Sequence, residues 1–172
     1  MNLFAYVGNS PVNFVDPFGT DKRGTCSAGS TSTSFSQYLN GVESTAWMFG
    51  QFLTGTGPSD LTFGAGSVES QMMASSPGIT QAINAYNNGQ TTGLYTFGLS
   101  GLWAAGANPI QQFVGSYTYT VSPTTGGLNI TLSNYTSVWS GSYHQLPSHQ
   151  RSTFRAMGTT HQTYQLFVPC HN

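Results

Sequence analysis

Histidines and arginines gather in one short stretch near the end of this 172-residue sequence. The stretch YHQLPSHQRSTFRAMGTTHQTYQ contains His144, His149, Arg151, Arg155 and His161. A neutral histidine can accept a proton, and an arginine presents a rigid fork of donors that holds a carboxylate or phosphate oxygen. We therefore predict that these five residues form a catalytic site. Structural hydrogen bonds to turn carbonyls are the alternative that this pattern leaves open.

The same stretch lacks the features of a metal site. Its histidines do not have a common zinc spacing and no cysteine pair lies nearby. The carboxylates that could help are distant in sequence: Glu43, Asp60 and Glu69. No metal site is predicted, and the sequence does not identify a cofactor. The glycine-rich stretch GTGPSDLTFGAG has no Lys-Ser/Thr ending, so we expect a loop there and not a phosphate-binding loop.

Charged side chains are scarce in this chain. Asp, Glu, Lys and Arg make up 5% of the residues, against about 25% in an ordinary globular protein. The formal net charge is −1, and four Lys and Arg residues are too few to neutralise the phosphates of a long duplex. The composition therefore excludes a long nucleic-acid surface, while 38% hydrophobic and 13% aromatic residues indicate a globular domain.

Two helices are predicted in the first half of the chain. Apolar residues recur at helical spacing from Phe35 to Leu53, with Ser34 as the N-cap and a stop at Gly55. A second helix fits PGITQAINAYNNG, residues 77–89, where Asn-Gly ends it. The glycine-rich apolar segment 93–107 favours a buried helix, with a membrane-active segment as the alternative.

The apolar period changes from 3.6 to 2 in the second half. Residues 113–121 and 128–132 alternate around the turn SPTTGG, which predicts a β-hairpin. Further strands are expected at 136–144 and 160–168. The sequence therefore predicts an α+β fold with N-terminal helices packed on a C-terminal antiparallel β-meander of about four strands. In that meander, His144 and His161 would face each other across a loop carrying His149 and both arginines.

The two cysteines leave two states open. Cys26 and Cys170 could form one end-to-end disulfide or stay as two thiols, and we narrowly favour thiols because two cysteines carry little framework information. We find no signal peptide, and no apolar stretch is long enough to span a bilayer as a helix. We therefore expect a protein that is soluble as made.

The opening stretch NLFAYVGNSPVNFVDPFG resembles the end of the core of Rhs (YD-repeat) proteins. The resemblance is carried by Asn2, Leu3, Tyr6, Val7, Asn9, Pro11, Asp16, Pro17 and Gly19. It implies an Rhs shell that ends in the Asp-Pro-x-Gly motif, followed by a polymorphic toxin tip. Thr20 departs from the usual Leu, and the core that would complete the cleavage machinery is missing, so Asp16 is not expected to cut alone.

The resemblance divides the chain into a core remnant at 1–19, a flexible linker at 20–34 and a toxin domain at 35–172. Such a tip is a secreted effector of interbacterial competition, delivered into target bacterial cells and neutralised by a cognate immunity protein. Three mechanisms remain open: an enzyme using the His/Arg cluster, a pore-forming toxin that inserts its charge-free middle into the target-cell membrane, and a non-catalytic binding module.

Overall fold

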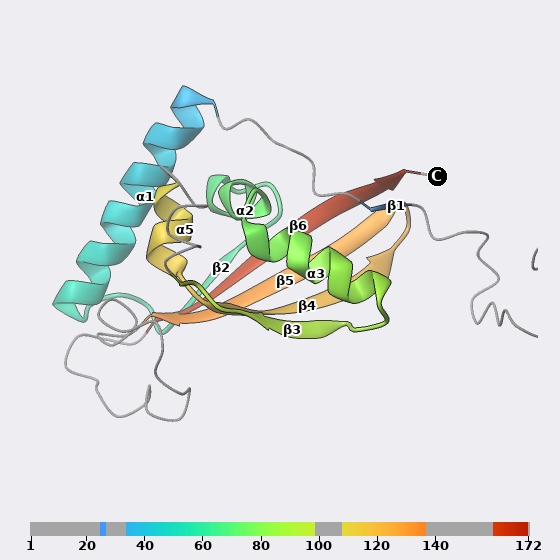
Figure 1. The fold of residues 1–172 in the computed structure, drawn as a ribbon. Helices are drawn as coiled ribbons and strands as arrows, with labels where there is room; N and C mark the ends of the chain where they lie inside the picture. Colours follow the sequence, from blue (N-terminus) through green and yellow to red (C-terminus); the bar gives the residue numbers. More distant parts are fainter. Residues whose placement is uncertain (1–24, 27–33, 99–107, 137–159, 172) are drawn as a thin grey trace, which may run out of the picture.

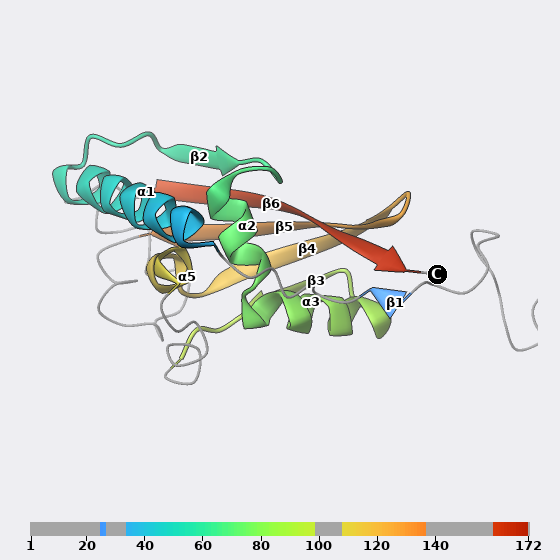
Figure 2. The ribbon, with the colours of Figure 1, turned by 90° about the horizontal axis from the view of Figure 1, so that it is seen from above.

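The computed structural model describes residues 25–26, 34–98, 108–136 and 160–171, and within them it has an α+β fold (Figure 1). A mixed six-stranded sheet has the order β1-β6-β5-β4-β3, and β2 also pairs with β6. The four helices of the described residues lie on one side of this sheet (Figures 1 and 2). In chain order the elements are β1 (Thr25–Cys26), α1 (Phe35–Thr54), β2 (Asp60–Phe63), α2 (Val68–Ala74), α3 (Pro77–Asn87), β3 (Thr92–Tyr95), α5 (Pro109–Val114), β4 (Tyr117–Thr124), β5 (Gly127–Thr136) and β6 (Thr160–His171).

Strand β6 is the strand on which the sheet is organised. It pairs antiparallel with β5 from Thr160, opposite Thr136, to Pro169, opposite Gly127. Its other edge is shared by two short strands. β2 runs parallel to the beginning of β6, and β1 runs antiparallel to its end. Strands from three distant parts of the sequence therefore meet on β6.

The predicted α+β class is confirmed, but the predicted separation of helices from strands is wrong. Strands β3, β4, β5 and β6 follow one another antiparallel in the sheet, whereas β2 is parallel to β6 and lies between helices in sequence. The expected loop at GTGPSDLTFGAG contains β2, and the expected helix at 93–107 begins with residues of β3. Strand β2 alternates polar and apolar residues over only two periods, which a glycine-rich surrounding outweighs, and its pairing partner is distant in sequence.

The two predicted helices and the hairpin are confirmed. Ser34 caps α1 through a capping box: its hydroxyl accepts from the backbone N–H of Gln37, and its own backbone N–H donates to the Gln37 side chain. Gly55 ends the helix with φ 66°. Helix α3 begins at Pro77, and β4 and β5 form the hairpin with Gly126 at φ 81° in the turn. The hairpin strand begins at Tyr117, because residues 113 and 114 belong to α5. Of the predicted strand 136–144, only Thr136 lies within the described residues, at the end of β5.

The hydrophobic core lies between the helices and one face of the sheet. Side chains of β4, β5 and β6 alternate between buried and exposed, and the buried set faces the helices. Its members on the strands are Tyr117, Tyr119, Val121, Leu128, Ile130, Leu132, Tyr164, Leu166 and Val168, and α2 and α3 contribute Met72, Met73, Ile79, Ala82 and Ile83. None of the helices in the described part of the chain is both long and apolar enough to cross a membrane.

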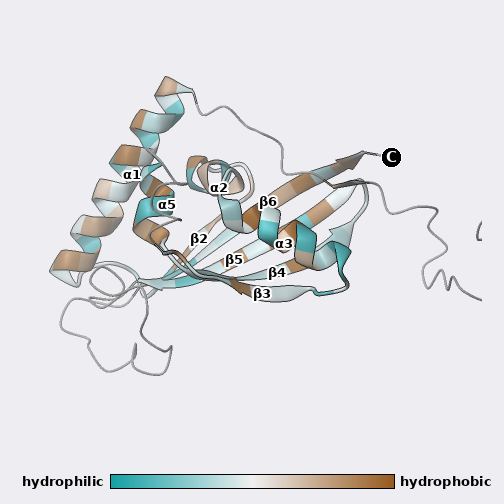
Figure 3. Ribbon diagram, in the orientation of Figure 1, coloured by the Kyte–Doolittle hydropathy of each residue, from teal (hydrophilic) through white to brown (hydrophobic). Residues whose placement is uncertain are grey.

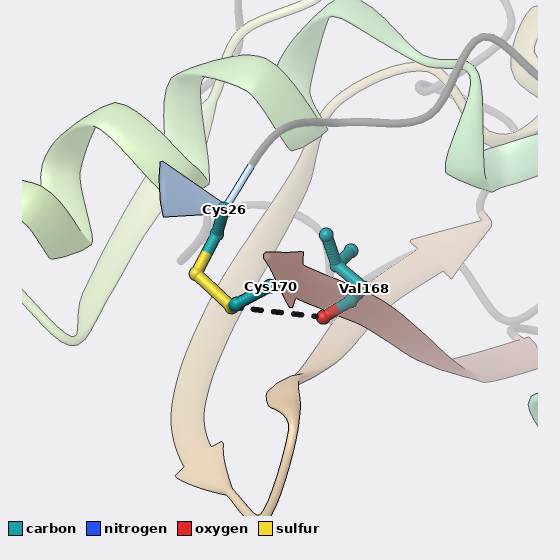
Figure 4. Close-up of a disulfide and its surroundings, with 3 residues drawn as sticks. All are labelled: Cys26, Val168 and Cys170. Atoms are coloured by element: carbon teal, nitrogen blue, oxygen red, sulfur yellow. Dashed lines mark hydrogen bonds between the residues drawn. A yellow bond between two sulfur atoms is a disulfide. The ribbon is translucent and has the colours of Figure 1, made fainter. Parts of the chain in front are cut away.

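A disulfide joins the two ends of the described chain (Figure 4). Cys26 on β1 and Cys170 on β6 are directly opposite in the antiparallel register, with a Cα–Cα distance of 4.1 Å. The favoured alternative of two thiols is therefore wrong. Thr25 and Cys26 belong to the segment predicted as a flexible linker, and they are held against the sheet by strand pairing and by this bond.

Breaking the disulfide should lower the free energy of unfolding. The bond closes a loop with a sequence separation of 144 residues. A disulfide lowers the entropy of the unfolded chain, and the reduction is larger when the closed loop is longer. We expect the reduced protein to be less stable by about 2 to 5 kcal/mol, measured as the shift of the urea midpoint on adding a phosphine reductant. The Cys26→Ser/Cys170→Ser variant should not respond to reductant, and equal midpoints for oxidised and reduced protein would contradict the prediction.

Two helical glycines should respond oppositely to alanine. A Cβ on Gly78 in α3 would collide with the rings of Tyr95 and Tyr117, whereas one on Gly50 in α1 would meet nothing within 4 Å. We expect Gly78→Ala to destabilise the fold by about 1 to 3 kcal/mol through overpacking. Gly50→Ala should stabilise it by about 0.5 to 1 kcal/mol because alanine favours the helix. Chemical unfolding of both variants measures the contrast, and changes of the same sign would refute it.

Candidate functional site

His161, at the beginning of β6, is the one member of the predicted catalytic cluster within the described residues. Its side chain is 26% exposed and lies on the face of the sheet opposite the helices. Both ring nitrogens have partners. Nδ1 lies 3.1 Å from Oδ1 of Asp60 on β2, and Nε2 lies 2.7 Å from Oγ of Ser133 on β5.

The protons in this group of three can be assigned from its chemistry. An ionised carboxylate only accepts hydrogen bonds, so the Nδ1–H of His161 donates to Asp60. In a neutral imidazole the other nitrogen is then an acceptor, and the Ser133 hydroxyl donates to Nε2. The order is therefore hydroxyl, imidazole, carboxylate, an arrangement in which a histidine can act as a base for a serine while an aspartate orients the ring.

Strand register places the three side chains together. Asp60 is directly opposite His161 in the parallel β2–β6 pair, and Tyr135 is opposite His161 in the antiparallel β5–β6 pair. Ser133 precedes Tyr135 by two residues, so its side chain is on the same face of the sheet. The backbone N–H of His161 also donates to the carbonyl oxygen of Ser59 at 2.8 Å, which fixes the beginning of β2 beside the histidine.

Aromatic stacking and hydroxyl groups surround the site. The Tyr135 ring stacks on the imidazole of His161, with ring centroids 4.4 Å apart and planes at 26°. Ser133 also belongs to a row of hydroxyl side chains across four strands, with Thr62 and Thr163 on one side and Thr118 on the other. The stacking restricts rotation of the imidazole, and the row offers donors and acceptors to a polar substrate laid across the strands.

Hydrogen bonds to Asp60 hold its carboxylate ionised. The Ser59 hydroxyl donates to Oδ2 at 2.9 Å and, together with His161, lowers the pKa of Asp60 below its ordinary 3.8, with Ser59 as the larger cause. The Asp60 side chain is 71% exposed, so water screens its attraction to His161. The contact therefore orients the imidazole more than it stabilises the fold.

The remaining predicted residues cannot be placed. His144, His149, Arg151 and Arg155, and the motif residues Asp16, Pro17 and Gly19, lie outside the described residues. Their assignment to a catalytic site and to a cleavage-motif remnant stays a prediction. Within the described residues, no three His, Cys, Asp or Glu side chains gather as a metal ion would require.

Sequence reasoning missed Ser133 and Asp60 as partners of His161. In the sequence, Asp60 is distant from the histidine cluster, and Ser133 lies one residue beyond the predicted strand 128–132. The available signal was the scarcity of acids, because Asp60 is one of only five Asp and Glu residues in the chain. Pairing of β2 with β6, 101 residues away, could not be read from that signal.

Comparisons with protein-family models, with curated proteins and with solved structures found no match for this chain.

The Ser59 hydroxyl should control the ionisation of Asp60. The pKa of Asp60 is lower in the folded protein than in the unfolded chain. The ionised carboxylate therefore stabilises the fold above the unfolded-state pKa of about 3.9, and this stabilisation is lost as the pH falls through the folded-state pKa. We expect Ser59→Ala to raise the pKa of Asp60 toward its ordinary value. A pH titration of the Asp60 carboxyl carbon by carbon-detected NMR measures this pKa. His161→Ala should raise it as well, and an unchanged titration in Ser59→Ala would refute the assignment.

Proposed function

We propose that this chain carries the toxin part of an Rhs-type polymorphic toxin, an antibacterial effector neutralised by a cognate immunity protein. We further propose that it is a hydrolytic enzyme that uses Ser133, His161 and Asp60. The toxin role rests on the motif between Asn2 and Gly19. The enzymatic mechanism rests on a single observation, that His161 is held between a serine hydroxyl at 2.7 Å and a carboxylate at 3.1 Å.

The geometry supports nucleophilic attack by serine on a carbonyl group. As the Ser133 oxygen bonds to the carbonyl carbon, its proton passes to Nε2 of His161, and Asp60 stabilises the imidazolium that forms. The imidazolium then gives this proton to the leaving group as the bond to the carbonyl carbon breaks. A water molecule, deprotonated by the same histidine, hydrolyses the acyl-enzyme and restores Ser133.

The position of the three residues favours a substrate larger than a buried pocket would hold. They lie on the face of the sheet opposite the buried side chains that pack against the described helices, and the hydroxyl row continues from Ser133 to both sides. An ester or amide within a polar polymer could approach Ser133 along this face. The proposed catalytic roles of His144, His149, Arg151 and Arg155 would add anion binding or proton transfer to this centre.

Removing the serine hydroxyl should abolish toxicity. In bacteria that lack the immunity protein, we expect the wild-type chain to stop growth and Ser133→Ala or His161→Ala to be harmless, with any measured turnover lowered roughly 100-fold or more. Asp60→Asn should retain more activity, with a loss of about 10-fold, because its carboxylate is exposed and acts by orienting the ring. Thr131→Ala, which removes a hydroxyl from the same face of β5, should remain fully toxic.

A fluorophosphonate probe tests the same site in the purified protein. Ser133 should displace fluoride and form one phosphonate ester, located by mass spectrometry, and Ser133→Ala should remain unlabelled while Thr131→Ala is labelled. Circular dichroism confirms that each variant is folded. Full toxicity of folded Ser133→Ala would overturn the catalytic proposal. Early loss of membrane potential in the same cells would favour the pore-forming mechanism, and unprotected cells that grow normally would overturn the toxin role.

A further inference from the structure

Helix α1 exposes a continuous apolar stripe, which we name the seam. It consists of Phe35, Leu39, Val42, Ala46, Phe49 and Leu53. These residues follow one another at intervals of 4, 3, 4, 3 and 4 along the helix, the spacing of a and d positions in a coiled coil. Phe35 is 75% exposed, Leu39 50% and Phe49 49%. Apolar residues recur along α1 in Figure 3.

The seam is centred away from the surface by which α1 packs on the rest of the protein, and it meets that surface where the Phe49 ring lies 6.5 Å from the ring of buried Phe52. The buried residues of α1 are Gly41, Met48 and Phe52, and the helix contacts α2 and α5. At 100° per residue, the seam lies about a third of a turn around the helix from this buried face. The core therefore does not account for the apolar side chains of the seam.

The seam is complementary to itself when two helices run antiparallel. With the two-fold axis at residue 44, Phe35 of one copy faces Leu53 of the other, Leu39 faces Phe49, and Val42 faces Ala46. In each of these pairs an a position meets a d position, as antiparallel packing requires. The small pair therefore lies at the centre of the interface and the large pairs lie towards its two ends, so every layer is apolar. A parallel pair would instead oppose Ala46 to Ala46 and Phe35 to Phe35.

We propose that a second copy of this chain docks on the seam, forming a two-fold symmetric dimer through antiparallel α1 helices. The inference rests on the exposed face of α1 and does not depend on the proposed function. Because both copies offer the same surface, the interface is closed and the assembly stops at two chains.

The exposed area is sufficient for a reversible dimer. From the exposed fractions of its five large side chains, the seam presents on the order of 600 Å² per copy, or roughly 1,200 Å² for two copies, the lower limit of stable interfaces. Helix α1 is 20 residues long, so the seam extends over about 30 Å. We therefore expect a dissociation constant on the order of 10 μM.

Charge favours a second copy over a membrane surface. Among the residues of α1, Glu43 is the only charged one, and the helix contains no Lys or Arg. Amphipathic helices that bind anionic bilayers place Lys and Arg on their polar face. In the antiparallel pair, Glu43 lies beside the seam and close to Glu43 of the other copy, so the two carboxylates repel each other weakly. Substitutions at Glu43 can therefore reveal the relative orientation of the two helices.

The dimer should be visible in sedimentation equilibrium of the full 172-residue chain. We expect Phe49→Ser to weaken association at least 10-fold, because it empties two symmetry-related layers. Phe167→Ser is the matched control: Phe167 on β6 is 48% exposed, nearly the same as Phe49, but lies outside the seam. Circular dichroism of both variants verifies that the fold is retained.

Glu43 distinguishes antiparallel from parallel helices. Glu43→Gln should tighten the dimer about two- to five-fold by removing the repulsion. A mixture of wild type and Glu43→Lys should form the heterodimer in preference to either homodimer, measured by native mass spectrometry, since only antiparallel helices bring these two positions together. A statistical mixture would overturn the antiparallel arrangement. A protein that is monomeric at 100 μM would overturn the dimer, and so would equal effects of Phe49→Ser and Phe167→Ser on association. Sedimentation of the monomer together with phosphatidylglycerol vesicles would also overturn it, because the seam would then bind a membrane surface.

Discussion

Backbone hydrogen bonding along β6 is the constraint on which the rest of the structure depends. One edge of this strand is occupied by β5, and the other is shared by β2 at its beginning and β1 at its end. The core is built against its buried face through Tyr164, Leu166 and Val168, and the opposite face carries His161. A shift of one residue in the register of β6 would move every one of these side chains to the wrong face. The same strand therefore determines both the packing of the core and the position of His161.

The elements that could be predicted are those whose signals are local. The capping residue Ser34, the stop at Gly55 and the alternation from Tyr117 to Leu132 each operate within a few residues, and the structure contains all three features. Strand β2 and the partners of His161 could not be predicted, because they depend on a parallel pairing across 101 residues. Of the five residues predicted to be catalytic, His161 is placed by the structure, and its neighbours come from strands outside the cluster. The disulfide required the same long-range information, since only the register of β1 on β6 shows that the two cysteines meet.

Polar groups occupy both faces of the sheet at the end where β5 finishes and β6 begins. On the helix side, the amide of Gln162 donates to the Thr136 hydroxyl at 2.9 Å, and the Tyr164 hydroxyl donates to the Gln162 carbonyl oxygen at 3.1 Å. These side chains are buried, and burial raises the pKa of Tyr164, which keeps it neutral. On the other side lie Ser133 and His161. A hydrogen-bonded interior layer fixes backbone positions without requiring charge, which suits a chain with 5% charged residues.

The bond between Cys26 and Cys170 also determines how the protein carries mechanical load. A force that pulls β1 away from the end of β6 acts on two strands that are joined covalently. Tension then passes through the sulfur atoms and bypasses residues 27–169, so the sheet and helices are not pulled apart. Between Cys26 and Cys170 the oxidised chain is therefore inextensible. Reduction would transfer the whole load to the two residue pairs of β1, which would peel away first.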